Sequence, residues 1–303
     1  MTFLTDLQQK ITDLLPATEL RFEESLAKHT SFRIGGPAEI MAFPKSKSEL
    51  AEILKVSALL DCKTVMLGAG TNVLAPDEGM RGLVICLKDC LGGIERLNDT
   101  GIRVAAGVTM TRAAVFAANA GLSGLEFAHG IPGTVGGGVY MNAGAYGGEI
   151  CQVCTQVEVM DMSGNHRIYT GDEMDFSYRH SRLEDEGGIV VSAVFTLSPK
   201  PTEEIRALMQ DLMARRSSSQ PLDLPSAGSA FKRPVGGYAA ALIDYAGLKG
   251  YRIGDAGVSE KHAGFVVNLG NATAADVKNV LIDVSNKVFE KSGIRLEPEV
   301  RIW

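Results

Sequence analysis

Two glycine-rich stretches of the chain have the composition of a backbone shaped around an anionic ligand. The first, residues 129–148, reads HGIPGTVGGGVYMNAGAYGG, and eight of its twenty positions are glycine. A flexible linker is rich in serine and charge, whereas these glycines alternate with apolar residues such as Ile131, Val135 and Tyr140, which favour burial. Glycine in that setting indicates a sharp turn or a close approach of another group to the main chain. A turn between two buried strands is the alternative interpretation.

The second stretch, LGAGTNVL at residues 67–74, directly follows a predicted strand. Consecutive N–H groups in such a turn can converge on an anion, and Thr71 and Asn72 add side-chain donors. Val73 stands where G-x-G-x-x-G has its third glycine, and no helical pattern follows, so this is not that dinucleotide fingerprint. One such turn is weak evidence. Two of them about sixty residues apart are better explained by a bulky diphosphate ligand.

Five cysteines stand at positions 62, 86, 90, 151 and 154. An odd number in so long a chain argues against a disulfide framework and favours a reducing cytoplasm. Cys151 and Cys154 form a C-x-x-C pair, but no second pair or neighbouring histidines complete a set of four ligands. We therefore expect no metal site.

The composition excludes several other classes of protein. The chain has 303 residues, 45% of them hydrophobic, and a formal net charge of −6. No run of Lys or Arg is longer than two, which argues against nucleic-acid binding. No uncharged apolar run is long enough to span a membrane, and the N-terminus lacks the basic leader of a secretory signal. We expect a cytoplasmic protein, monomeric, with no nucleic-acid or membrane partner.

Hydrophobic periodicity divides the chain into an N-terminal helix with its lead-in at 1–28, a first domain at 29–198 and a smaller α+β domain at 199–303. The SPKPTEE segment, which begins at Ser198, marks the second boundary. In the first two segments we expect a helix ending before residue 16, strands at 64–67 and 82–87, a helix at 109–121, a hairpin within 155–169 and a strand at 189–197.

The last hundred or so residues are predicted to contain three helices and several short strands. The first helix would bury Leu208 and Met213 along with other apolar residues at helical spacing. The last would open at Thr273, with Asp276 completing a capping pair, and would bury Phe289. The other expected elements are a helix near 238–248, strands near 256–258 and 265–268, and a final strand over 296–303.

Seven motifs occur in the order found in the UDP-N-acetylenolpyruvoylglucosamine reductase (MurB) family, which the chain resembles over nearly its whole length. The two glycine-rich stretches are among them. The others are HTSFRIGG (29–36), SYRHS (177–181), PSAGSAFKRP (225–234), LIDYAGLKG (242–250) and LEPEVR (296–301).

This resemblance implies a fold and a cofactor. The family has an FAD-binding domain of the vanillyl-alcohol-oxidase (PCMH) type followed by a smaller α+β substrate-binding domain. It reduces UDP-N-acetylglucosamine enolpyruvate to UDP-N-acetylmuramate in peptidoglycan synthesis, with non-covalent FAD and with NADPH as hydride donor. The cofactor-binding residues that the resemblance implies are Leu67, Gly68, Ala69, Gly70, Thr71, Asn72, Val73, Pro132, Gly133, Thr134, Gly136, Gly137, Asn142, Ala143, Gly144 and Arg216.

Three residues match the family's catalytic positions. Arg179 would face the substrate carboxylate, Ser229 would protonate the α carbon, and Glu299 would help polarise the enolate-like intermediate. Spacing alone singles out none of them. A surface arginine, a turn hydroxyl and an edge-strand carboxylate are the structural alternatives.

Tyr178, Arg233, Lys249 and His262 match substrate-binding positions of the family, and the sequence departs from the family nearby. Members commonly carry Lys where this chain has Ser219, which puts one phosphate contact in doubt. HANF is replaced by HAGF. The short connection after residue 234 resembles the subtype that lacks an extra tyrosine-bearing loop.

Two alternative functions stay open at the level of sequence. The chain could be another FAD-dependent oxidoreductase with the same FAD domain, or a non-catalytic nucleotide-sugar-binding relative. Its C-terminal motifs argue against the first alternative, and the presence of all three catalytic matches argues against the second.

Overall fold

The structure, a computed structural model, describes residues 4–303. The chain forms two compact units, and each is assembled from separate segments. Unit 1 consists of Met1–Phe22, Glu39–Ala69 and Arg81–Ala214, and unit 2 consists of Glu23–Ala38, Gly70–Met80 and Arg215–Trp303.

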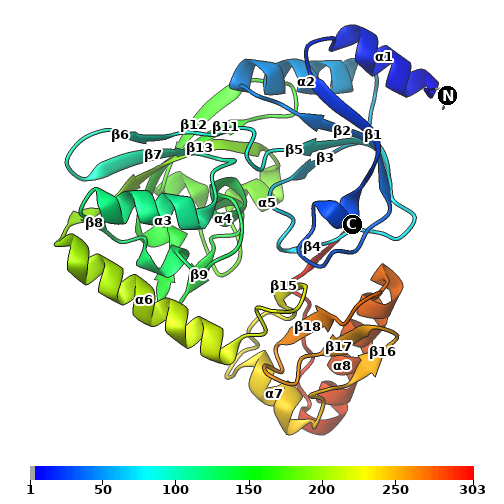
Figure 1. Cartoon of the computed structure of the whole chain (residues 1–303), viewed down its shortest axis with the longest axis vertical. Coiled ribbons are helices and arrows are strands. Elements are labelled where there is room, and N and C mark those ends of the chain that lie inside the picture. The colour runs from blue at the N-terminus through cyan, green and yellow to red at the C-terminus, as the bar shows by residue number, and fades with distance from the viewer. Residues whose placement is uncertain (1–3) are drawn as a thin grey trace. The chain divides into compact units, whose positions relative to one another are not determined.

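One sheet of unit 1 carries the strand that leads into the LGAGTNVL turn. Its order is β1-β2-β5-β3 (Figure 1), with bounds β1 Glu19–Ser25, β2 Pro37–Phe43, β5 Met80–Cys86 and β3 Thr64–Leu67. Strands β3 and β5 are parallel, which confirms the strands predicted at 64–67 and 82–87. Helices α1 (Asp6–Leu14) and α2 (Lys47–Leu59) share a hydrophobic core with this sheet.

The second sheet of unit 1 supports the glycine-rich stretch. Its order is β12-β11-β13-β7-β6, with bounds β12 His166–Thr170, β11 Cys154–Met160, β13 Ile189–Thr196, β7 Gly101–Ala105 and β6 Ile94–Arg96. The predicted hairpin is β11 paired antiparallel with β12. Helices α3 (Met110–Asn119) and α4 (Val135–Tyr140) close a core with the sheet, and α4 packs against β13.

Unit 2 is built on a four-stranded antiparallel sheet. Its order is β15-β18-β17-β16, with bounds β15 Ser226–Ser229, β18 Phe265–Asn268, β17 Ala256–Val258 and β16 Arg252–Ile253. Helix α8 (Ala274–Ser292) packs on this sheet and α7 (Ala239–Tyr245) packs on α8 (Figure 1). Valines 277, 280, 284 and 288 of α8 are fully buried, so the predicted apolar stripe forms the core.

The predicted capping pair at the start of α8 is confirmed. Thr273 Oγ1 accepts a hydrogen bond from Asp276 N, and the Asp276 carboxylate accepts one from Thr273 N. The prediction that Phe289 is buried was wrong, because this ring is 42% exposed near the end of the helix.

Two further expectations need correction. The final strand, β19, comprises only Arg301–Ile302 and pairs in parallel with β4 (Val73–Leu74). Helix α6 runs over Thr202–Ser219, but Leu208 and Met213 are exposed and only Ile205 and Met209 are buried. The remaining short elements are α5 Arg182–Glu186, β8 Leu122–Ser123, β9 Gly144–Ala145, β10 Gly148–Glu149 and β14 Ser198–Pro199.

Long-range bonds explain why unit 2 contains two segments from the first half of the chain. Ser31 N donates to Gly70 O at 3.0 Å, and Ser31 Oγ donates to Ser226 O at 2.6 Å. The side chain of Asn268 donates to Phe32 O at 3.0 Å. The division at 1–28, 29–198 and 199–303 stays a prediction. Boundaries of this kind assign each domain one continuous segment, whereas each unit here is made of three separate segments.

Within residues 4–303, no helix is both long and apolar enough to cross a lipid bilayer.

Asp77 caps α8 from a loop far away in the sequence. Its carboxylate accepts hydrogen bonds from Ala274 N at 2.7 Å and Ala275 N at 3.2 Å. An acidic group at a helix N-terminus satisfies free N–H groups and complements the helix dipole. The loop over residues 70–80 is thereby fixed to the core helix of unit 2.

We expect Asp77→Ala to lower the free energy of unfolding by about 1–2 kcal/mol, the usual loss when a helix cap is removed. Urea denaturation followed by circular dichroism measures the change. The matched control is Glu78→Ala, which removes an exposed neighbouring carboxylate and should change the midpoint little. Equal effects of the two substitutions would contradict the capping role of Asp77.

Candidate functional site

The stretch at 129–148 is a fixed part of unit 1. Residues 109 and 134 form a β-bridge. Val135 N donates to Val108 O at 2.8 Å, and Gly136 N donates to Ala106 O at 2.9 Å. The main chain is therefore anchored just before and within α4, and the linker interpretation is excluded.

The glycines of α4 serve two different purposes. A Cβ on Gly136 would lie 2.9 Å from Ala106 Cβ and 3.2 Å from Ala106 O, so packing requires glycine there. A Cβ on Gly138 would lie 2.7 Å from Met110 Sδ, so the Met110 side chain would have to shift. Gly137 is exposed, and the nearest atom to its Cβ position is Thr134 Oγ1 at 3.7 Å. Glycine inside a helix costs about 1 kcal/mol relative to alanine. No neighbour within the protein requires it at 137, so its lack of a Cβ fits close approach by a ligand.

The two glycine-rich turns touch each other inside unit 1. A Cβ on Gly68 would lie 2.7 Å from Thr134 Oγ1, and Thr134 is buried. Leu67 and Ala69 also belong to unit 1, whereas residues 70–73 belong to unit 2. A side chain on Gly70, whose φ is +62°, would collide with the carbonyl oxygen of His29.

Asn142, predicted as a cofactor-binding residue, uses its side chain within the protein. It is 1% exposed. Its Nδ2 donates to Ser177 O at 2.9 Å, and its Oδ1 accepts a hydrogen bond from Cys151 N at 3.0 Å. Ala143 is also bonded through its main chain, to Gly138 O at 2.7 Å. The residues after α4 therefore hold the segments around Ser177 and Cys151 in place through hydrogen bonds.

Arg179 occupies a strained turn. Ser177 and His180 form a β-bridge with two main-chain hydrogen bonds of 3.2 Å, so Tyr178 and Arg179 are the two central residues. Arg179 has φ +56°, a left-handed conformation that favours glycine and costs other residues about 1–2 kcal/mol. Strain of this kind concentrates at functional sites.

Arg179 is half-buried. Its Nη2 donates to Gly144 O at 3.4 Å, and its Cζ lies 5.0 Å from the centre of the Tyr178 ring. The Tyr178 side chain is 43% exposed. An arginine held in this way can recognise a carboxylate through its planar set of donors.

In unit 2 the main chain brings Ser229 and Glu299 together. Glu299 N donates to Ala230 O at 2.9 Å, and Phe231 and Pro298 form a β-bridge. Ser229 is exposed at the end of β15, after an irregularity in the pairing with β18. Such irregularities redirect side chains at functional sites. Glu299 precedes the final strand, which corrects the prediction that it lies within that strand.

Asn72, also predicted as a cofactor-binding residue, holds the segment that carries Glu299. Its Nδ2 donates to Glu299 O at 3.2 Å, and its main-chain oxygen accepts a bond from Arg301 N at 3.0 Å. Sequence reasoning did not assign a role to Ser31, which ties the Gly70 turn to β15. Its position within the HTSFRIGG motif was the only available signal.

The predicted substrate-binding residues of unit 2 are polar and accessible. Arg233 stacks over the Tyr238 ring at 4.8 Å, and Lys249 Nζ lies 3.2 Å from Asp244 Oδ2. His262 Nδ1 accepts a hydrogen bond from the main chain at 3.1 Å. Burial, and then the charge of Lys249, lower the pKa of His262, which favours the neutral imidazole at neutral pH.

Arg216 and Ser219 lie in the last turn of α6. Ser219 Oγ donates to Arg215 O at 2.8 Å, so this hydroxyl is used by the helix itself. Lys261 Nζ donates to Ser217 O at 2.7 Å, which places an ammonium group at the same helix end. Arg216 O accepts the N–H of Gln220 at 2.9 Å.

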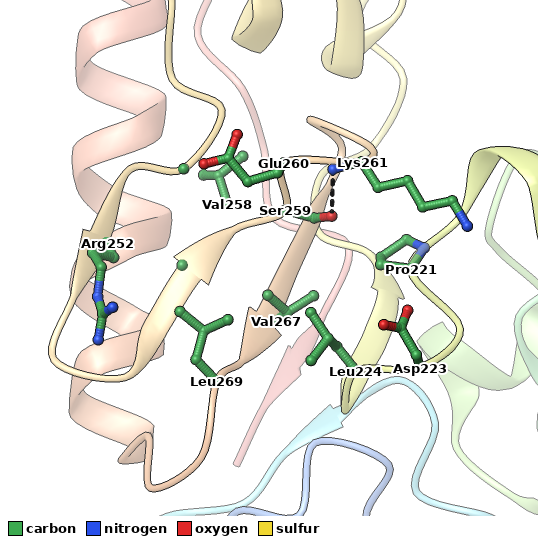
Figure 2. Close-up of a pocket in the computed structure, with 12 residues that line it drawn as sticks. Pro221, Asp223, Leu224, Arg252, Val258, Ser259, Glu260, Lys261, Val267 and Leu269 are labelled. Carbon is green, nitrogen blue, oxygen red and sulfur yellow. Dashed lines mark hydrogen bonds between the residues drawn. The ribbon is translucent and has the colours of Figure 1, made fainter.

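Unit 2 also contains a pocket of about 280 Å³ (Figure 2). Val267, Leu269 and Leu224 are among its apolar lining residues, and Asp223 and Lys261 are among its charged ones. None of the predicted catalytic or substrate-binding residues lines it.

The cysteines show no sign of reactivity. All five are free. Burial raises the pKa of Cys154 to about 12, and partial burial also raises that of Cys151, so both thiols are protonated at neutral pH. Within residues 4–303 no cluster of His, Cys, Asp and Glu could hold a metal ion.

The fold and these sites together define a class of protein. In unit 1, Gly68 of one glycine-rich turn meets Thr134 of the other. In unit 2, a main-chain bond from Glu299 N to Ala230 O holds Glu299 next to the strand end that bears Ser229. Residues 38–169 match a family model described as an FAD binding domain. The class is thus a flavoprotein oxidoreductase with an FAD domain of the vanillyl-alcohol-oxidase type and a second α+β domain.

Residues 220–303 match the family model described as UDP-N-acetylenolpyruvoylglucosamine reductase, C-terminal domain. The reductase of Agathobacter rectalis is 47% identical over 97% of both chains. That of Caldanaerobacter subterraneus is 45% identical over 98% of this chain and 97% of its own. The chain belongs to the UDP-N-acetylenolpyruvoylglucosamine reductase family.

Solved structures agree with this assignment. The crystal structure of the reductase (MurB) from Thermus caldophilus has a TM-score of 0.78 and 36% identity, and covers 94% of this chain and 98% of its own. Alkyldihydroxyacetonephosphate synthase is 13% identical, with a TM-score of 0.50 over 66% of this chain and 42% of its own. The second likeness shows the fold alone. The predicted fold class and FAD cofactor are confirmed.

The strain at Arg179 leads to a prediction about stability. Arg179→Gly should leave the free energy of unfolding unchanged or raise it by up to about 1 kcal/mol, because glycine adopts φ +56° without strain. Tyr178→Gly, at the preceding turn position, should lower it. Thermal and urea unfolding measure both variants. A clearly destabilised Arg179→Gly protein would show that the arginine is required by the fold.

The open position at Gly137 leads to a prediction about cofactor binding. Gly137→Ala should fold at least as stably as the parent, since the nearest atom to the added Cβ is Thr134 Oγ1, at an ordinary contact distance of 3.7 Å. It should weaken FAD binding about tenfold or more, or by about 1.4 kcal/mol, if the flavin nucleotide approaches there. Flavin absorbance per protein and thermal unfolding of the apoprotein are the two measurements. Unchanged FAD affinity would exclude contact at this position.

Proposed function

We propose that this protein reduces UDP-N-acetylglucosamine enolpyruvate to UDP-N-acetylmuramate, with NADPH as hydride donor, in the synthesis of peptidoglycan precursors for the cell wall. One observation carries the proposal. In a C-terminal region that matches the reductase family model, main-chain bonds hold Glu299 beside the end of the strand that bears Ser229.

Both alternatives are weaker than the reductase. Another FAD-dependent oxidoreductase would share the FAD domain but not a C-terminal domain of this family. A non-catalytic nucleotide-sugar-binding relative would have no need for an arginine in a strained turn. The similarity to named reductases over nearly full length also favours the enzyme.

The protein offers FAD a glycine position at residue 137 that no neighbour within the protein requires. When bound, FAD supplies the hydride transfer that this chain's side chains cannot perform. The residues proposed to hold it are 67–73, 132–134, Gly136 and Gly137, together with Ala143, Gly144 and Arg216. The absence of a Cβ at Gly137 fits this role.

Ser229 is proposed to donate the proton that completes the reduction. Addition of hydride to the β carbon of the enolpyruvyl group leaves negative charge on the α carbon and its carboxylate. The Ser229 hydroxyl makes no hydrogen bond within the part of the chain that the structure describes and is exposed. The hydroxyl is therefore available to transfer its proton to the α carbon. The negatively charged α carbon is a stronger base than the serine alkoxide that this transfer leaves. Glu299 would help to polarise the intermediate.

Arg179 is proposed to bind the substrate carboxylate. Its permanent charge and planar donors match a carboxylate, and the attraction increases as negative charge develops there. Tyr178, Arg233, Lys249 and His262 are proposed to contact the UDP-sugar. The cationic side chains among them suit a diphosphate, and a neutral His262 can still donate one hydrogen bond.

A cytoplasmic location and a monomeric state complete the proposal, with no nucleic-acid or membrane partner. Five free cysteines support the reducing compartment, because disulfides are common only in oxidising ones. The negative net charge supports the absence of a nucleic-acid partner.

Replacement of Ser229 tests the proposal. The parent protein should be yellow, be bleached by NADPH, and regain its colour when the enolpyruvyl substrate is added. Ser229→Ala should keep the NADPH step and substrate affinity, while substrate-dependent turnover falls about 10²–10⁴-fold, the usual contribution of a positioned acid. Stopped-flow absorbance separates the two steps.

The matched control is Ser226→Ala, at the other end of the same strand β15, which should turn over at the parental rate. If Ser229→Ala reduces substrate as fast as the parent, Ser229 is not the proton donor. If the parent itself is bleached by NADPH but never regains its colour with substrate, the proposed reaction is wrong.

A further inference from the structure

The turn that carries Arg179 is hydrogen-bonded at both ends to residues 140–142, at the end of α4 and just after it. On one side, Asn142 Nδ2 donates to Ser177 O at 2.9 Å. On the other, Ser181 Oγ donates to Tyr140 O at 2.7 Å. Both donor side chains are buried, with Asn142 at 1% and Ser181 at 0% exposure. Water therefore competes little for either bond.

Ser181 does not perform the local role expected of its position. It is the N-cap residue of α5 (Arg182–Glu186), yet its side chain makes no capping bond. Serine at an N-cap usually bonds to its own helix. Its hydroxyl instead reaches a carbonyl 41 residues away in the sequence. This choice stabilises the turn at the expense of the short helix.

Asn142 is likewise suited to one task. Its φ of +43° is a conformation that asparagine tolerates better than most residues. Its carboxamide Oδ1 fixes Cys151 N at 3.0 Å, which orients Nδ2 toward the Arg179 turn. The Asn142 side chain is thus fixed by Cys151 N at its oxygen and fixes Ser177 O with its nitrogen.

A strained turn persists only where its surroundings determine it more strongly than its own preference. Without its two fastenings, the Ser177–Ser181 turn could relax from the left-handed conformation of Arg179. We propose that Asn142 and Ser181 are positioning residues, which hold the Arg179 turn so that its guanidinium is placed for the substrate carboxylate. This inference rests on the carboxylate-binding role proposed for Arg179.

Double-mutant cycles test this inference in the FAD-loaded enzyme. Asn142→Gly removes the carboxamide and keeps the backbone conformation accessible, and Ser181→Ala removes only the hydroxyl. Each is made in the parent and in Arg179→Ala. In the parent, each should lower kcat/KM for the enolpyruvyl substrate about tenfold or more, and in Arg179→Ala each should lower it less than about twofold. Substrate affinity, followed by the shift of the flavin absorbance, should show the same dependence on Arg179.

Asn98→Gly is the matched control. Asn98 also holds a turn in unit 1, where its Oδ1 accepts bonds from Thr100 N at 2.9 Å and Gly101 N at 2.7 Å. Its loss should lower thermal stability while kcat/KM and substrate affinity stay at parental values. Bleaching by NADPH without substrate should proceed at the parental rate in Asn98→Gly and in Ser181→Ala.

Equal losses in the parent and Arg179→Ala backgrounds would overturn the inference, because the two side chains would then act on the fold in general. Parental activity in both single variants would overturn it as well. If Arg179→Ala alone keeps parental kcat/KM, the carboxylate role fails first and the inference with it, so the two failures are distinguishable. If Asn142→Gly does not fold, the Ser181→Ala cycle decides.

Discussion

The close approach of Gly68 to Thr134 is the constraint on which unit 1 depends. A Cβ atom at residue 68 would lie 2.7 Å from Thr134 Oγ1, so only glycine lets the two turns meet there. The Thr134 hydroxyl also accepts the N–H of Gly137 at 3.4 Å, and the next residue, Val135, is bonded to Val108. The buried Thr134 therefore determines the position of the backbone at residues 67–69 and the start of α4. It also determines that Gly137 is the glycine of α4 that faces outward.

Local patterns predicted much of the fold, and tertiary interactions account for the errors. The strand at 64–67, the hairpin of β11 and β12, and the Thr273 capping pair follow from periodicity and capping chemistry. The final strand is shorter than its alternating pattern suggests, because β4 offers it only two residues as partners. The inclusion of residues 23–38 in unit 2 depends on bonds such as Ser31 to Ser226, which leave no local signal in the sequence.

The site was predictable in composition but not in geometry. Family motifs indicated Arg179, Ser229 and Glu299, yet no pattern revealed that Arg179 adopts φ +56°. The sequence also could not distinguish glycines required by packing from Gly137, which no neighbour requires. Asn142 lies among the predicted cofactor contacts, and only the structure shows that its side chain bonds to Ser177 and Cys151. Side-chain direction is set by burial and long-range partners, which a single sequence does not contain.

The segment from Thr134 to Gly144 combines two tasks that the proposed reaction needs. Its first half presents an open glycine, and its second half supplies Tyr140 O and the Asn142 carboxamide to the Arg179 turn. Because α4 is rigidly anchored on β13 and on residues 106–108, a displacement of this segment must disturb both tasks together. Substitution at Gly136, where the Ala106 backbone and Cβ leave no room, should therefore affect flavin binding and Arg179 alike, whereas substitution at Gly137 should affect only the former. The physical link between the proposed cofactor contact and the proposed carboxylate recognition in unit 1 is this one short stretch of backbone.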